Sequence, residues 1–187
     1  MSKAKMGLTL NVGYQLRDAS GKIKKTFQEN KLFSFLMKKG IVSPHFFKIP
    51  FLLGRWSDNV VRANLVTNAG KAAAAGLLTG DVTDFFDYIA VGTGTTAAAV
   101  TDTTLETESA TAGLTRAAST NSRVTTDVTN DTAQFLKSFS VTGTVAVTES
   151  GVLSASSGGT LLARQVFSAI NVVNGDTLQI TWKIDVD

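Results

Sequence analysis

The stretch LQITWKIDVD, residues 178–187, alternates apolar and polar residues without a break. Because successive side chains of a β-strand point to opposite faces, this alternation predicts a strand with one buried and one solvated face. Trp182 falls on the apolar side, and we expect it to lie in the core. The apolar positions are Leu178, Ile180, Trp182, Ile184 and Val186.

Similar runs precede this strand and are separated by residues that favour turns, at 129–131, 154–159 and 173–176. Regularly spaced strands without helices between them favour an antiparallel sandwich or barrel. We therefore predict a mainly β fold, an antiparallel and jelly-roll-like β-sandwich over residues 65–187. The expected strands cover residues 86–92, 122–129, 133–143, 144–150 and 160–170.

The first part of the chain, residues 1–64, has a different organisation and predicts a basic N-terminal arm. Two strand-like runs around Asp-Ala-Ser-Gly at 18–21 predict a β-hairpin. A short helix over 31–39 and an extended aromatic segment over 43–58 follow. The body then begins with an alanine-rich helix within residues 66–80 that ends at Gly80.

Charge divides the chain at the same place. Residues 1–64 hold 12 basic and 3 acidic side chains, whereas the remainder holds 6 basic and 12 acidic ones. A basic segment joined to an acidic body can attract nucleic acid, an anionic surface or the acidic part of a neighbouring copy. Head-to-tail self-assembly is our preferred interpretation of this charge pattern, and ordinary solvated faces are the alternative. Nucleic-acid binding is less favoured, because the basic residues are mostly lysines without interleaved aromatics for base stacking.

Composition narrows the chemistry that the chain can perform. Cysteine is absent and His45 is the single histidine, which excludes thiolate and multi-histidine metal sites. We expect no cofactor, and no enzymatic activity because no nucleophile, base and orienting group can be nominated together. No apolar run is long enough for a transmembrane helix, so we expect no membrane partner.

Gly92, Gly94 and Ala97 satisfy the dinucleotide-binding pattern G-x-G-x-x-G/A after a predicted strand. That pattern binds a pyrophosphate when a helix follows inside a βαβ unit, whereas a threonine-rich segment follows here. We therefore predict a tight turn in which the glycines serve backbone conformation. The acidic groups Glu106 with Glu108, and Asp81 with its neighbours 84 and 87, are expected to be solvated loop charges rather than a glycosidase pair or a calcium site.

The second part of the chain carries an ordered series of short motifs. A strand leads into GTGTT at 92–96, followed by T-D-T-x-L-x-x-E at 101–108, E-x-G at 149–151, G-G-x-L-x-x-R at 158–164 with Phe167, and a terminal W-x-I strand at Trp182. This order resembles a recurrent β-domain of virion proteins from tailed bacteriophages, and the resemblance covers about residues 65–187. Leu153 stands where that family often has phenylalanine.

The resemblance implies a structural component of a virion, either a capsid-decorating protein or a tail- or neck-associated one. Its partners would be other copies of the chain and the major capsid or tail proteins, with assembly in the host cytoplasm. The alternatives are a nucleic-acid-binding module that uses the basic arm and a carbohydrate- or receptor-binding β-sandwich. We expect the arm to supply the subunit interface, through Lys22, Lys24, Lys25, Lys38, Lys39, Phe46, Phe47, Phe51, Leu52 and Trp56.

Overall fold

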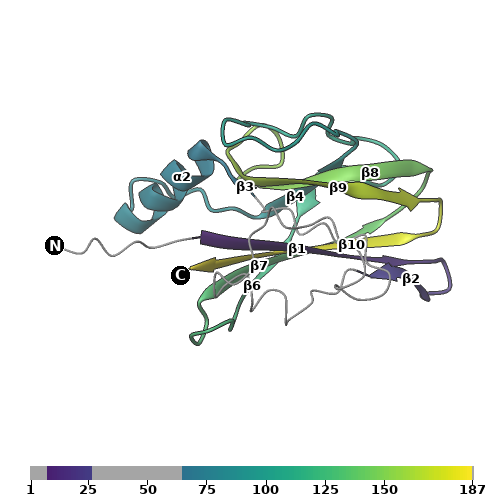
Figure 1. Ribbon diagram of the computed structural model, residues 1–187, viewed down its shortest axis with the longest axis horizontal. Helices are drawn as coiled ribbons and strands as arrows, with labels where there is room; N and C mark the ends of the chain where they lie inside the picture. The colour runs from purple at the N-terminus through teal and green to yellow at the C-terminus, as the bar shows by residue number, and fades with distance from the viewer. Residues whose placement is uncertain (1–7, 27–64, 187) are drawn as a thin grey trace, which may run out of the picture.

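The computed structural model of the protein describes residues 8–26 and 65–186. In these residues, two antiparallel sheets of five strands each pack face to face (Figure 1). The mainly β sandwich predicted from the sequence is confirmed. The first sheet has the order β2-β1-β10-β7-β6, with bounds Ile23–Thr26, Leu8–Arg17, Thr177–Val186, Thr132–Ser140 and Thr120–Val124. The second has the order β3-β9-β8-β4-β5, with bounds Leu65–Val66, Leu161–Val172, Val145–Leu153, Tyr88–Gly92 and Ala117–Ala118.

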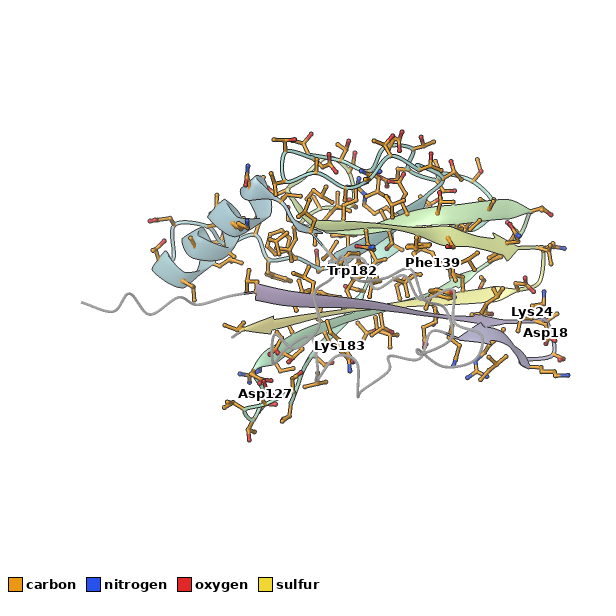
Figure 2. All side chains as sticks on the ribbon, in the orientation of Figure 1. Asp18, Lys24, Asp127, Phe139, Trp182 and Lys183 are labelled. Atoms are coloured by element: carbon orange, nitrogen blue, oxygen red, sulfur yellow. The ribbon has the colours of Figure 1, made fainter. Side chains whose placement is uncertain are left out.

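The apolar face of β10 lies in the core between the sheets, as its alternation predicts. Trp182 and Phe139 lie between the two layers (Figure 2), and the Trp182 side chain is fully buried. Its indole N–H donates to Ser150 Oγ of the opposite sheet over 3.1 Å, and that hydroxyl donates to the Ala90 carbonyl over 2.9 Å. The polar atom of the buried tryptophan is thus satisfied by a contact that joins the sheets.

The predicted N-terminal hairpin is present as β1 and β2. Its turn is held by the Asp18 carboxylate, which accepts from the backbone N–H of Ser20 over 2.9 Å and of Lys22 over 3.0 Å. β1 pairs with β10 along its whole length, from Leu8 opposite Val186 to Arg17 opposite Thr177. The hairpin therefore belongs to the first sheet, which differs from the arm boundary expected at residue 64. The rest of that expected arm, residues 27–64, lies outside the described residues.

The alanine-rich helix is α2, Asn68–Thr79, and it projects beyond one end of the sandwich (Figure 1). Thr67 caps its first turn, because its Oγ1 accepts from the Gly70 N–H over 2.9 Å and also donates to the Leu161 carbonyl. Gly80 ends the helix with φ of 79°, as expected for a left-handed C-terminal glycine. The cap thus attaches the start of α2 to β9.

One predicted strand is shorter than its sequence suggests. The run over 122–129 was expected to remain extended, but β6 ends at Val124. The Asp131 carboxylate accepts from the backbone N–H groups of Thr126, Asp127 and Val128, over 2.8, 2.8 and 2.6 Å. Because these amides turn towards one carboxylate, they cannot continue a sheet ladder.

Gly70 is where α2 approaches β9, and we predict that replacing it with alanine destabilises the protein. A Cβ there would lie 2.4 Å from the Leu162 carbonyl oxygen, a backbone atom that cannot move away easily. Although alanine is the better helix former, we expect Gly70→Ala to lower the free energy of unfolding by about 1 to 3 kcal/mol in urea. Gly76→Ala is the matched control, because the atom in its way is a Val82 methyl group. An equal loss in both variants would contradict this account of the docking.

Candidate functional site

The loop between β4 and β5, residues 93–116, covers the outer face of the second sheet (Figure 1). The start of this loop runs antiparallel to residues 107–109, because the Thr93 N–H donates to the Thr107 carbonyl and the Ser109 N–H donates to the Val91 carbonyl, each over 2.9 Å. Leu105 inserts into a small apolar cluster on this face and is 4 % exposed. The other members of that cluster are Ala90, Leu153, Leu161 and Tyr88.

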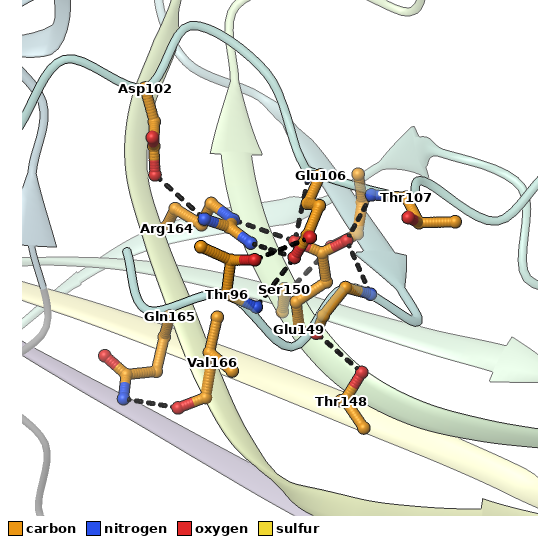
Figure 3. Close-up of polar contacts among 12 residues, drawn as sticks. Thr96, Asp102, Glu106, Thr107, Thr148, Glu149, Ser150, Arg164, Gln165 and Val166 are labelled. Atoms are coloured by element: carbon orange, nitrogen blue, oxygen red, sulfur yellow. Dashed lines mark hydrogen bonds and ion pairs between the residues drawn. The ribbon is translucent and has the colours of Figure 1, made fainter. Parts of the chain in front are cut away.

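A buried carboxylate on β8, Glu149, holds this loop in place (Figure 3). Its side chain is fully buried and accepts backbone N–H groups from two separate segments of the loop, at residue 94 and at residues 106–107. Oε1 accepts from Gly94 over 3.0 Å and from Thr107 over 2.7 Å, and Oε2 accepts from the Glu106 N–H over 3.1 Å. Hydrogen bonds to a charged acceptor are stronger than neutral ones, so one side chain fixes two loop segments.

Arg164 of β9 neutralises this carboxylate from the neighbouring strand. Its Nε donates to Glu149 Oε2 over 2.8 Å and its Nη1 to Asp102 Oδ2 over 2.9 Å, while the Glu106 carboxylate lies 3.4 Å from Nη2. Burial alone would lower the pKa of Arg164, but its hydrogen bonds to Asp102 and Glu149 raise that pKa above its ordinary value. Arg164 therefore stays charged. We call Asp102, Glu106, Glu149 and Arg164 the anchor cluster.

Gly92 and Gly94 are required for close approach rather than for an unusual backbone angle. Neither glycine has positive φ, which corrects the expectation that they serve backbone conformation. A Cβ on Gly92 would lie 2.3 Å from the Thr107 carbonyl oxygen, and one on Gly94 would lie 2.5 Å from Glu149 Oε1. No helix follows this glycine pair, as the sequence predicted. The pattern thus makes room for a carboxylate of the same chain.

The acidic residues 106 and 108 are not simply solvated, which corrects a second expectation. The Thr96 hydroxyl donates to Glu106 over 2.7 Å and is the main reason that the pKa of this carboxyl lies below its ordinary value. Glu108 receives both Nε and Nη2 of Arg116, over 2.9 and 2.5 Å. Arg116 Nη1 also donates to the carbonyls of Ala155 and Gly158. Arg116 therefore ties the covering loop to the β8–β9 turn.

These contacts favour a structural role for the anchor cluster. Glu149 is shielded from solvent and has fixed donors on both oxygens, so it lacks the access and the free lone pair needed for acid–base chemistry on an outside substrate. Within the described residues there is no group of three or more histidine, aspartate or glutamate side chains suited to a metal ion. None of their helices is long and apolar enough to cross a membrane.

The predicted interface residues are largely outside this site. Lys22 is exposed in the β1–β2 turn. Lys24 Nζ forms an ion pair with Asp176 Oδ1 over 2.6 Å, and its side chain is 39 % exposed, so it is already engaged within its own subunit. Lys25 belongs to β2, but its side chain is not described. The remaining candidates lie outside the described residues: Lys38, Lys39, Phe46, Phe47, Phe51, Leu52 and Trp56.

Sequence reasoning did not assign roles to Glu149 and Arg164, although a signal existed. Each is a charged residue within an otherwise apolar strand, in VAVTESGVL and LLARQV. A charge that a strand pattern places among buried residues needs a partner, and these two are the opposite charges available on neighbouring strands. The register brings their backbones close, with Gly151 opposite Arg164 and Glu149 opposite Val166.

Comparison of the chain with models of protein families, with curated proteins and with solved structures gave no match.

Removing the charge of Glu149 should release the loop of residues 93–116 from the second sheet. In Glu149→Gln an amide N–H₂ would face backbone donors and Arg164 would lose its buried partner, so we expect a loss of about 3 to 5 kcal/mol in the free energy of unfolding. Glu106→Gln is the matched control, because it removes one carboxylate from the same cluster at a side chain that is 38 % exposed. Its loss should stay below about 1 kcal/mol. Urea unfolding compares the two, and equal losses would contradict the role of Glu149.

Proposed function

We propose that the protein is a structural component of a tailed-bacteriophage virion, a capsid-decorating or a tail- or neck-associated protein. In this role it acts through contacts with other copies of itself and with the major capsid or tail proteins. It is assembled in the host cytoplasm and resides in the particle. In this role the protein contributes binding surfaces to the particle and catalyses no reaction.

One observation supports the proposal most: the separate motifs behind the family resemblance meet at the anchor cluster and its surroundings. Gly94 and Glu106 contact Glu149, whereas Asp102 contacts Arg164. A Cβ on Gly151 would lie 2.7 Å from Leu105 Cδ1, so this glycine makes room for the leucine of the loop. Motifs from four distant segments thus serve one packing task. That supports a resemblance of fold rather than a coincidence of composition.

The same arrangement suits a protein that works in many copies. A loop of more than twenty residues would ordinarily be mobile, but here two of its segments share one carboxylate and its Leu105 packs against a sheet face. A fixed surface loses little conformational entropy when it binds, and repetition by symmetry multiplies a modest contact. A rigid sandwich whose covering loop is fixed by hydrogen bonds therefore supports a role in a repetitive assembly.

The subunit interface predicted for residues 22–56 remains a prediction. Its lysines would steer association and its aromatic residues would provide buried contact. The β1 pairing limits how this can be tested: deleting residues 1–64 would also remove β1 from its position beside β10. Substitution of the aromatic residues in the full chain is the appropriate variant.

The proposal is tested by locating the chain in particles. Density-gradient-purified phage from cells that produce the chain should contain it in several copies per particle, measured by quantitative mass spectrometry against the major capsid protein. Immunogold microscopy would then assign it to head or tail. Replacing Phe46, Phe47 and Phe51 with serine should lower its occupancy, whereas replacing the sheet residues Ser122, Ser138 and Gln179 with alanine should not. Recovery of the chain entirely in the soluble fraction would contradict a virion role.

A further inference from the structure

One exposed face of α2 carries a lysine, an alanine and a leucine, and an aspartate follows the end of the helix. Lys71, Ala75 and Leu78 are spaced four and three residues apart, which places them on one face of the helix, and all three are exposed. Leu78 is 77 % exposed. Gly70 is the buried residue of this helix, and it faces Leu162 of β9. Helices of this length depend on tertiary packing for stability, and Leu78 is an apolar side chain of α2 that is left available for contact.

The charges beside α2 are placed contrary to its own dipole. Lys71 stands at the end of the first turn, near the positive end of the helix, and Asp81 follows the last turn, near the negative end. Asp81 is exposed, and its Oδ2 accepts from the Thr79 hydroxyl over 2.7 Å, which keeps it beside the helix end. The first turn has no acidic residue and the last turn has no basic residue. Within one subunit this arrangement is unfavourable.

We propose that the face formed by Lys71, Ala75 and Leu78 pairs with the same face of a second copy, with the two helices antiparallel. This orientation places Lys71 beside Asp81 of the second copy, and each charge then lies near the helix end that its sign favours. In the same register Leu78 of one copy lies over the alanines around position 75 of the other, and small residues allow close helix approach. Because the contact is two-fold symmetric, both copies use one surface.

The pairing is independent of membership in a virion, since it rests on α2 alone. One helix face covers much less than the roughly 800 Å² per partner typical of stable complexes, so we expect a weak contact in solution. Such a contact gains strength where copies are held close together, as in an assembly. A covalent trap is therefore the suitable measurement.

The absence of cysteine from the chain allows single-cysteine variants of the full protein to report the pairing. Ala75→Cys places a thiol near the proposed two-fold axis, and Ala69→Cys is the matched control, exposed on another side of the same helix. We expect oxidation to link Ala75→Cys into dimers at least about tenfold faster than Ala69→Cys, on non-reducing gels at equal concentration. Circular dichroism verifies that both variants are folded. Equal rates would overturn the proposal.

A charge reversal tests the antiparallel register. Added to Ala75→Cys, Lys71→Glu should slow dimer formation because it places an acid beside Asp81 of the second copy, and adding Asp81→Lys should restore the rate. Fast linkage that does not respond to Lys71→Glu would overturn the antiparallel arrangement. Linkage of Ala69→Cys at the faster rate would also contradict it, because another face would then be the one in contact.

Discussion

The hydrogen bonds to the Glu149 carboxylate are the constraint on which the second sheet and its covering loop depend. A buried charge is tolerated when fixed partners replace water, and Glu149 has Arg164 and three backbone amides for that purpose. Because those amides come from both ends of residues 93–109, satisfying the charge and closing the loop are the same event. The apolar contact of Leu105 then completes the seal over the sheet.

This constraint gives the glycine-rich and acidic motifs a structural task within the chain. The Gly94 N–H donates to the Glu149 carboxylate as the N–H groups of a phosphate-binding loop donate to a phosphate, but here the anion belongs to the protein. Arg164 is likewise occupied by Glu149 and Asp102 of the same chain. The residues that could suggest an active site in the sequence therefore make contacts within the chain that fix the covering loop on the sheet.

Features decided by residues close together in the sequence could be predicted, whereas contacts between residues far apart in the chain could not. Alternation in β10, the Asp18 turn and the Gly80 helix end are local features, and each was predicted correctly because neighbouring residues decide it. The ion pairs were missed because their partners are far apart in the chain, as for Arg164 and Asp102, 62 positions apart. The early end of β6 was missed for another reason: the run is rich in valine and threonine, which favour strands, but Asp131 competes for its backbone amides. Competition of this kind between a side chain and the sheet produces no repeating pattern of apolar residues in the sequence.

Amide hydrogen exchange of Gly94, Glu106 and Thr107, followed by NMR, tests the central claim most directly. If Glu149 holds the loop, these three amides open only with the whole domain, and their exchange free energy should match that of global unfolding to within about 1 kcal/mol. The amide of Ser157, in the exposed β8–β9 turn, serves as a fast reference. Exchange of the three loop amides at the rate of Ser157 would contradict the account, because the loop would then open without disturbing the sandwich.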